Sequence, residues 1–264
     1  MASAHDQTLG RAFDGQAAAF ELAPIQTDPA LLAGLVAITA LPAGAHVLDA
    51  GCGPGLLAAA FLDDPRGYRM TGCDLSAEMV ARARRRCAPF GDRCTFVKES
   101  LAALAGAVRS GALPMFDAAV TRLTLHHSPD PARFVRDMVG ATRAGGSVLL
   151  CDHLADDDPA LADWHRRVES MRDSSHVCNL SARALVALAT AAGLVDIHYE
   201  ECAIATEFDE WFDRGTPSAP KEACRAALLG DEGRRSRAWR VSPLDDGGIR
   251  LDGSVGIARG VVPG

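Results

Sequence analysis

The chain has 264 residues and a formal net charge of −7, from 27 Lys and Arg against 34 Asp and Glu. With 48% hydrophobic and 23% charged residues, it has enough apolar side chains for a sizeable core and is not compositionally disordered. The acidic balance argues against a partner held mainly through its phosphate groups, because such binding needs a basic face. We therefore expect neither nucleic acid nor an anionic membrane as a partner.

The longest apolar stretch, residues 31–41, stops at Pro42 and is much shorter than the roughly 20 residues that a membrane span needs. It predicts a buried helix and no membrane span. The first seven residues lack the basic and apolar regions of a secretory signal, which predicts a cytoplasmic location. Eight cysteines without a C-x-x-C pair predict reduced thiols, with neither a structural metal site nor a disulfide framework.

Two helices are predicted before the first strand, at residues 13–21 and 28–40, the second with Pro29 at its first position. From about residue 45, short β-rich segments alternate with longer helical ones, the pattern of a parallel sheet covered by helices. The predicted strands are residues 46–49, 69–73, 95–97, 116–121 and 146–151. The predicted helices between them are residues 56–62, 77–87, 101–110 and 131–143.

After the fifth strand the spacing changes, and residues 154–180 predict an acidic, helical insert. A helix at 181–192 ends at Gly193, where glycine favours a helix stop. The remaining predicted elements are a strand at 194–203, a charged helical stretch at 207–237 and a last strand at 249–260. We predict a single domain over residues 1–264, with cap elements at 1–40, 154–180 and 205–240.

A glycine-rich turn follows the first predicted strand in the sequence VLDAGCGPG, residues 47–55. Glycine lets the backbone bend sharply and approach a ligand closely. The spacing Gly-x-Gly-x-Gly followed by Leu56 differs from the G-x-G-x-x-G of dinucleotide-binding folds. Asp49, just before the glycines, fits a cationic ligand better than a phosphate. The pattern favours a cofactor with sulfonium and amino groups over NAD; the alternative is a tight turn without a ligand.

A second acidic residue, Asp74, ends the second predicted strand. In open parallel sheets ligands bind at the carboxyl ends of the strands, where an Asp can accept hydrogen bonds from both ribose hydroxyls. The alternative role is to cap the next helix, but Ser76 already fits that position. The ligand role is therefore the favoured hypothesis for Asp74.

Together these residues resemble the class I S-adenosylmethionine (SAM)-dependent methyltransferases, in particular the methyltransferase-11 type, whose best-known members act in ubiquinone and menaquinone biosynthesis. Further similar segments are residues 13–17 (FDGQA), 116–131, 143–146 (RAGG), 171–177 (MRDSSHV), 209–212 (DEWF) and 248–250 (GIR). The resemblance implies an α/β fold with a Rossmann-like, seven-strand, mostly parallel sheet and a helical cap. It also implies SAM as cofactor and S-adenosylhomocysteine (SAH) as product.

The resemblance also implies which residues contact the cofactor. Asp49 and the backbone of Arg122 would meet the methionine part, Asp74 the ribose, and Leu75 and Met79 the adenine. The family usually has an Asp after the third strand, where this chain has Ser100 beside Glu99; a hydroxyl gives a weaker contact there. The full implied set is Asp49, Gly51, Gly53, Gly55, Asp74, Leu75, Met79, Ser100 and Arg122.

Methyl transfer from a sulfonium is an in-line displacement in which the protein supplies alignment and desolvation, so no nucleophilic enzyme residue is required. A general base is needed only for a weakly acidic hydroxyl, a protonated amine or a carbon acid, and His is the natural candidate. Four histidines compare on this ground: His126 and His127 after the fourth strand, His153 at the end of the fifth, and His176 in the insert. The candidates for the base are His127, His153 and His176. Structural hydrogen bonding is the alternative role of each.

Phe13, Arg172 and Trp211 are the candidates for acceptor binding, although aromatic residues of the inserts also fit an ordinary core. We predict methyl transfer to an O, N or C nucleophile of a small molecule, quinone-like or a specialised metabolite, by a monomer or homodimer. A nicotinamide oxidoreductase is disfavoured by the spacing at Leu56. A second alternative stays open: a protein of the same fold that binds SAM but catalyses a cyclisation or isomerisation.

Overall fold

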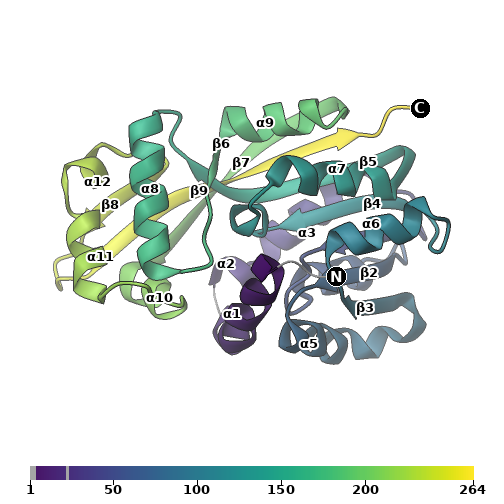
Figure 1. Ribbon diagram of the computed structural model, residues 1–264, viewed down its shortest axis with the longest axis horizontal. Helices are drawn as coiled ribbons and strands as arrows, with labels where there is room; N and C mark the ends of the chain where they lie inside the picture. Colours follow the sequence, from purple (N-terminus) through teal and green to yellow (C-terminus); the bar gives the residue numbers. More distant parts are fainter. Residues whose placement is uncertain (1–3, 22–23) are drawn as a thin grey trace.

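The computed structural model describes residues 4–21 and 24–264, and its centre is a mixed sheet with helices on both faces (Figure 1). Seven strands follow one another in the order β3-β2-β1-β4-β5-β9-β7. The first five are parallel, whereas β9 is antiparallel to both of its neighbours. Their bounds are β1 (His46–Ala50), β2 (Arg69–Asp74), β3 (Cys94–Lys98), β4 (Phe116–Arg122), β5 (Thr142–Ala155), β7 (Val195–Glu207) and β9 (Ile249–Val261). The predicted seven-strand, mostly parallel sheet is confirmed.

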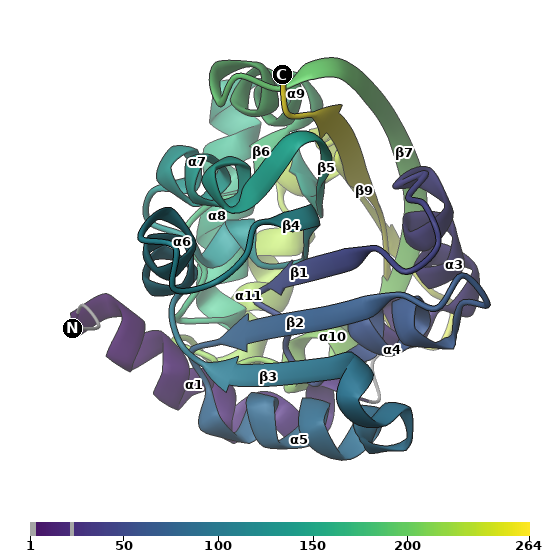
Figure 2. The ribbon, with the colours of Figure 1, turned by 90° about the vertical axis from the view of Figure 1, so that its right-hand side faces the viewer.

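Helices cover the two faces of this sheet because its central strands are apolar on both sides. Val47 and Val120 face α3 (Pro29–Ile38), α4 (Leu56–Asp63) and α5 (Ala77–Cys87). Leu48 is next to Val47 in its strand and Ala119 is next to Val120, so both face the opposite helical layer. That layer consists of α6 (Leu101–Arg109), α7 (Pro131–Ala141) and α9 (Ala182–Ala191) (Figure 2).

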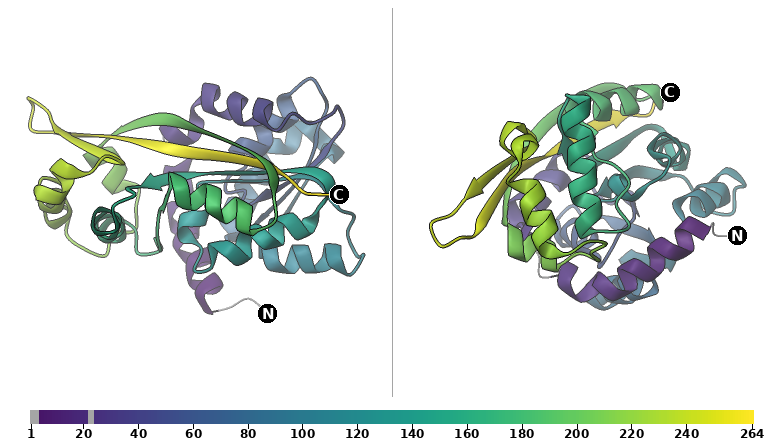
Figure 3. Two further views of the ribbon diagram at one scale, coloured as in Figure 1. Left: turned by 90° about the horizontal axis from the view of Figure 1, so that it is seen from above. Right: turned by 60° about the vertical axis from the view of Figure 1, so that its left-hand side comes forward.

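The cap is built on β7 and β9, which run beyond the parallel strands (Figure 3). It has its own apolar core, in which Trp164, Trp211 and Trp239 are buried. The sequence predicted a helical cap, but β8 (Trp239–Pro243) pairs with β9 as a hairpin, with Gly247 in the left-handed region of the turn. The short strand β6 (Leu180–Ser181) beside β5 was also not predicted. The cap helices are α8 (Pro159–Arg172), α10 (Phe208–Asp213), α11 (Lys221–Leu228) and α12 (Asp231–Arg235).

The N-terminal helix α1 (Ala4–Phe20) begins nine residues before the predicted start at residue 13 and lies against α5. Its Asp14 accepts hydrogen bonds from the Ser76 hydroxyl (2.6 Å) and the backbone N–H of Glu78 (3.1 Å). Of the cap element predicted at 1–40, residues 1–3 and 22–23 lie outside the described residues, and α3 packs in the main core. Across the described residues, every helix is too short or too polar to cross a membrane.

Candidate cofactor and acceptor site

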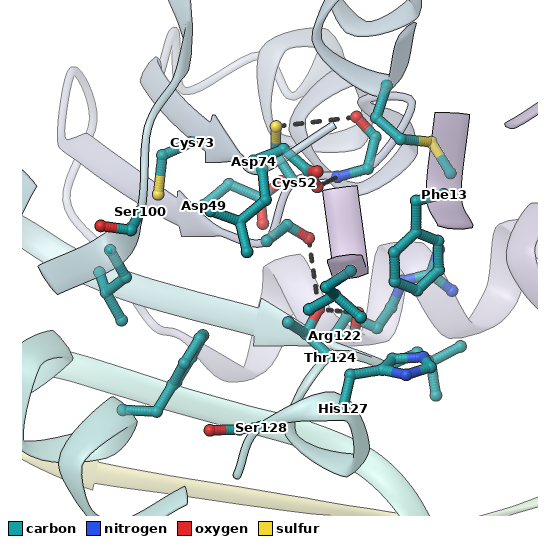
Figure 4. A pocket seen from close by; sticks show the side chains of 18 of the residues that line it. Phe13, Asp49, Cys52, Cys73, Asp74, Ser100, Arg122, Thr124, His127 and Ser128 are labelled. Carbon is teal, nitrogen blue, oxygen red and sulfur yellow. Dashed lines mark hydrogen bonds between the residues drawn. The ribbon is translucent and has the colours of Figure 1, made fainter. Parts of the chain in front are cut away.

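A cavity of about 450 Å³ opens at the carboxyl ends of β1, β2 and β4, beside α1 (Figure 4). The strand order reverses between β1 and β4, and such a switch point is where open α/β sheets bind their ligands. Of the predicted cofactor residues, eight line this cavity: Asp49, Gly51, Gly53, Asp74, Leu75, Met79, Ser100 and Arg122. The structure thus brings together residues from the ends of four strands.

Gly55 is the predicted cofactor residue that does not line this cavity. It lies at the start of α4 with φ of 80° and faces α5, where an added Cβ would come within 2.9 Å of the Ala83 Cα. Its lack of a side chain therefore permits the close packing of two helices. This packing is a role of Gly55 that the sequence did not reveal, and its backbone contact with the cofactor stays a prediction.

The glycine turn is held by the end of β2. Gly51 donates its backbone N–H to the Cys73 carbonyl oxygen (2.9 Å), and Gly53 donates to Asp74 Oδ2 (2.9 Å). The second oxygen of Asp74 accepts from the backbone N–H of Ser76 (2.9 Å). The carboxylate thus fixes two backbone turns while it lines the cavity.

The two roles considered for Asp74 are hydrogen bonding to a ribose and capping of the next helix. Ser76 caps α5, because its hydroxyl accepts from the backbone N–H of Met79 (3.1 Å), as the sequence predicted. Burial raises the pKa of Asp74 and the nearby Asp14 carboxylate adds to this, while the backbone hydrogen bonds oppose the shift. A partly desolvated carboxylate at this edge of the sheet is well suited to accept hydrogen bonds from hydroxyl groups.

Asp49 is the most unusual group in the cavity. Its side chain is buried, and Oδ2 lacks a hydrogen-bond partner among the residues that the structure describes. Burial raises its pKa to about 7; the Asp74 carboxylate adds to the rise, and the Arg122 guanidinium opposes it. Because an unpaired buried carboxylate is costly, this position favours a ligand that brings a positive charge. The residues present therefore fit a cationic cofactor.

The Arg122 side chain has a role that the sequence did not reveal. Its guanidinium donates to the Gln26 side-chain Oε1 (2.7 Å) and to the carbonyl oxygens of Gln26 (3.1 Å) and Ile25 (3.2 Å) in α2 (Pro24–Thr27). Arg122 thereby ties the short N-terminal helix to the end of β4. Arg122 also lines the cavity, and contact of its backbone with the methionine part stays a prediction.

Ser100, for which the resemblance implies an adenine contact, lines the larger cavity. Its hydroxyl accepts from the backbone N–H of Ala103 (3.2 Å) and so caps α6. The neighbouring Glu99 lines the same cavity and offers a carboxylate there. The hydroxyl is thus shared between a helix cap and any adenine contact.

A smaller cavity of about 50 Å³ lies between the strand ends and the cap. Gln26, Leu123 and His127 line both cavities, so these side chains lie between the two spaces. Arg172 and Trp211, predicted for acceptor binding, line the smaller cavity, whereas Phe13 lines the larger one. Other residues of the smaller cavity are His126, His153, Glu169, Arg214 and Trp239, of which Glu169, Arg214 and Trp239 were not predicted.

Four imidazoles gather at and beside the smaller cavity. The ring of His126 lies 4.0 Å from that of His127, 5.5 Å from that of His153 and 5.7 Å from that of His176, between centroids. His127 also packs edge-on against Phe13 at 4.8 Å. His176 lines neither cavity, and its Nε2 lies 3.2 Å from Asn179 Oδ1.

Three of these histidines are poor proton acceptors. Burial lowers the pKa of His127 to about 3, with the charge of His126 adding to the effect, and lowers the pKa of His153 to about 3 for the same two reasons. Burial also lowers the pKa of His176, against the opposing charge of Glu169. All three are therefore neutral near pH 7.

His126 differs from the other three, because Asp152 at the end of β5 lies 2.6 Å from its Nδ1. In the sequence Asp152 is next to His153, and neighbours in a strand are expected to face opposite sides of the sheet. It gave no signal that Asp152 would meet a histidine 26 residues away. The pair forms only because the loop after β4 packs against the end of β5.

Comparison with known proteins identifies the family. Residues 26–199 match the model of a methyltransferase domain. An uncharacterized methyltransferase of Bacillus subtilis, YcgJ, is 30% identical over 192 residues, which cover 72% of this chain and 73% of YcgJ. The crystal structure of YcgJ aligns with a TM-score of 0.75 at 25% identity, covering 88% of this chain and 98% of that one.

A ubiquinone biosynthesis O-methyltransferase of Xanthomonas axonopodis pv. citri is 36% identical over 109 residues, which cover 41% of this chain and 43% of that protein. This shorter match is consistent with the longer ones. The chain belongs to the methyltransferase-domain family and is a class I SAM-dependent methyltransferase.

Proposed function

We propose that this enzyme transfers the methyl group of SAM to an O, N or C nucleophile of a small-molecule acceptor that binds in the smaller cavity. The observation that carries the proposal is that Gln26, Leu123 and His127 line both cavities. A small shift of these side chains would bring an acceptor on the cap side into contact with a cofactor in the larger cavity. An in-line displacement requires that direct contact.

The larger cavity suits each part of the cofactor. Asp49 would face its positively charged methionine part, Asp74 would accept from the ribose hydroxyls, and Leu75 and Met79 would contact the adenine. Gly53 has no atom within 4 Å of the place where a Cβ would stand, so its backbone is open to a ligand. SAM supplies an activated methyl group on a sulfonium, and the chain supplies alignment and exclusion of water.

The junction between the cavities is held in a strained conformation. Leu123, directly after β4, has φ of 54°, which is uncommon for a residue with a branched side chain. Its backbone N–H donates to the Cys151 carbonyl oxygen (2.8 Å), which holds this conformation in place. Backbone strain of this kind is concentrated at functional sites, and it supports placing the reaction here.

The smaller cavity favours a flat, partly apolar acceptor. The rings of Trp211 and Trp239 lie 4.9 Å apart in an edge-to-face arrangement, and both line the cavity with Leu251. Aromatic walls of this kind suit an aromatic ligand. A quinone-like or aromatic specialised metabolite matches these walls, and because about 50 Å³ is too small to enclose it, it would also extend into the larger cavity.

The test is to incubate the protein with SAM and a panel of phenols, aromatic amines and activated carbon acids, and to measure SAH by chromatography. We expect SAH to form with at least one acceptor, together with a product heavier by one methyl group. Product formation while SAM stays intact would instead support a cyclase or isomerase. SAH formation no faster than in the absence of any acceptor would contradict methyl transfer to these classes.

A further inference from the structure

Two arginines line the smaller cavity, and both stand at the ends of cap helices. Arg172 is the last residue of α8, and Arg214 directly follows α10. Only 8% of Arg172 is exposed, and only 13% of the Arg214 side chain. A guanidinium group with so little contact with water is costly unless it has hydrogen-bond acceptors of its own. The partners of these two groups therefore indicate what the cavity can bind.

Arg172 uses one of its three side-chain nitrogens to hold the fold. Nε donates to the Trp211 carbonyl oxygen (2.8 Å). Nη1 has two carboxylate neighbours, Glu169 at 3.7 Å and Asp173 at 3.9 Å, and both lie beyond hydrogen-bond distance. Within the part of the chain that the structure describes, neither Nη atom makes a hydrogen bond. This end of the guanidinium is therefore available to a ligand in the cavity.

Arg214 is held in a similar way. Its Nε lies 3.0 Å from Glu210 Oε1 and donates to the Glu210 carbonyl oxygen (3.3 Å), while its Nη atoms lack hydrogen bonds among the described residues. Burial lowers the pKa of Arg214, and the charge of Arg172 adds to this. The nearby carboxylates, led by Glu210, oppose the shift. The two guanidinium groups thus lie close enough to repel each other, and an anion bound to both would offset this repulsion.

Glu169 is the one carboxylate in the described lining of this cavity. Its Oε1 lies 3.6 Å from His165 Nε2, and its Oε2 lies 3.7 Å from Arg172 Nη1. Burial alone would raise the pKa of Glu169, but the contact with His165 and the other basic side chains nearby outweigh it and lower that pKa. Glu169 is therefore charged and balances one arginine. One positive charge is left over, in a chain whose net charge is −7.

The histidines of the lining do not change this balance. His127 and His153 are neutral near pH 7, because their pKa values are lowered to about 3. His126 lies 2.6 Å from Asp152, so any positive charge on its ring is offset by that carboxylate. The arginines therefore set the charge of the smaller cavity.

Resting on the proposed function, we propose that the acceptor is a carboxylic acid whose carboxylate binds to Arg172 and Arg214 in the smaller cavity. A guanidinium group presents parallel N–H donors that match the two oxygens of a carboxylate. The single excess charge also fits a carboxylate, because a phosphate carries close to two negative charges. The carboxylate is a binding group, and the methylated atom lies elsewhere on the same molecule, toward the larger cavity.

The size and walls of the cavity narrow the acceptor further. A space of about 50 Å³ has room for a carboxylate, whereas the body of the acceptor must extend beyond it. The Arg172 guanidinium lies 5.2 Å from the centre of the Trp211 ring, so the charged site adjoins the aromatic wall. An aromatic acid with a hydroxyl, amino or acidic carbon nucleophile matches both features.

The first test measures binding and needs no methyl transfer. Benzoate, phenylacetate and cinnamate are titrated by calorimetry into the protein saturated with SAH, and each is compared with its carboxamide, which has a similar shape but no charge. At least one carboxylate should bind tenfold or more tightly than its amide, because the amide lacks the charged hydrogen bonds to the guanidinium groups. If no carboxylate binds more tightly than its amide, the proposal is overturned.

Substitution of the arginines should remove this preference for the charged form. Arg172→Gln and Arg214→Gln should each lower the affinity for the carboxylate about tenfold or more and leave the affinity for the amide unchanged. A purely structural role would weaken both ligands equally. Arg214→Gln decides the matter if Arg172→Gln fails to fold, since Arg172 also holds the Trp211 backbone. Arg166→Gln, at an exposed position of α8 outside both cavities, is the matched control and should keep the preference.

The second test measures methyl transfer. Phenols and aromatic amines that carry a carboxylate are compared with their carboxamides, and SAH formation gives kcat/KM for each. We expect kcat/KM to be at least tenfold higher for the acids, and Arg214→Gln to abolish this difference while the Kd for SAM stays the same.

The outcomes separate the two proposals. If the acids bind through the arginines but no acceptor yields SAH, the acid site is supported and the proposed methyl transfer fails. If amides are methylated as fast as acids, or if Arg214→Gln keeps the wild-type preference, methyl transfer stands and the carboxylic acid acceptor is overturned.

Discussion

The carboxylate of Asp74 accepts a hydrogen bond from the backbone N–H of Gly53, 2.9 Å away and 21 residues earlier in the chain. This bond joins the end of β2 to the glycine turn after β1, so one side chain both shapes the larger cavity and lines it. The roles of these residues lead to four predictions that can be tested separately.

Replacing Asp74 should weaken cofactor binding. Asp74→Ala removes the carboxylate proposed for the ribose hydroxyls and loosens the turn at Gly53, so we expect the Kd for SAM to rise about a hundredfold, or about 2.7 kcal/mol. Titration calorimetry with SAM and SAH measures this. Asp245→Ala, at an exposed position, is the control. Equal affinity in Asp74→Ala and the wild type would refute the assigned role of Asp74.

The affinity for SAM should depend on pH through Asp49, whose pKa is raised to about 7 by burial. A positively charged ligand favours the carboxylate, so below pH 7 Asp49 must lose a proton when SAM binds. Affinity should fall by up to tenfold per pH unit below about 7 and level off above about 8. Calorimetry at pH 7 in buffers of different ionisation enthalpy should show release of about half a proton.

Asp49→Asn should remove this dependence, and it is the control for it. An affinity that is the same at pH 6 and pH 8 in the wild type, or a slope that persists in Asp49→Asn, would count against the pairing of Asp49 with the cationic part of the cofactor.

The same carboxyl should limit the stability of the ligand-free protein. Because its folded-state pKa of about 7 exceeds the ordinary 3.8, its contribution favours the folded state fully below pH 3.8 and is lost as pH rises to 7. Asp49→Asn should therefore raise the free energy of unfolding at pH 8 by roughly 2–4 kcal/mol, and by less at pH 5. Urea denaturation at both pH values measures the difference. A variant no more stable than the wild type at pH 8 would contradict the shifted pKa.

Two glycines of the same turn should respond differently to alanine. Gly51 and Gly53 both have positive φ (72° and 50°), but a Cβ at Gly51 would lie 2.4 Å from the Thr124 Cγ2, whereas a Cβ at Gly53 would point into open space. Gly53→Ala should lower the free energy of unfolding by about 1–2 kcal/mol through left-handed backbone strain. Gly51→Ala should lower it further, because the clash with Thr124 adds to the same strain. Gly53→Ala should fold but bind SAM more weakly, because its methyl group would occupy the ligand's space.

Thermal unfolding and calorimetry on the two variants separate these effects. If Gly51→Ala were as stable as Gly53→Ala, the contact with Thr124 would not constrain the turn. If Gly53→Ala bound SAM as tightly as the wild type, the cofactor would not approach this part of the backbone.

The sequence by itself determined the sheet and the place of the larger cavity. Alternating β-rich and helical segments predict the parallel strands, and the glycine turn with Asp49 and Asp74 at two strand ends predicts where a ligand binds. These signals are local, because each depends on residues that are neighbours in the chain. Ser76 as the cap of α5 is a prediction of the same kind, and the structure confirms it.

Only the tertiary structure decided the side of the site that faces the cap. The side chain of Arg122 holds α2, Gly55 packs two helices together, and Asp152 meets His126 rather than a residue near it in the chain. Strand periodicity says that Asp152 and His153 point to opposite sides, but not which segment lies on each side. That choice depends on how the loop after β4 and the cap pack against the end of β5, and it arises from contacts between distant segments that no local pattern encodes.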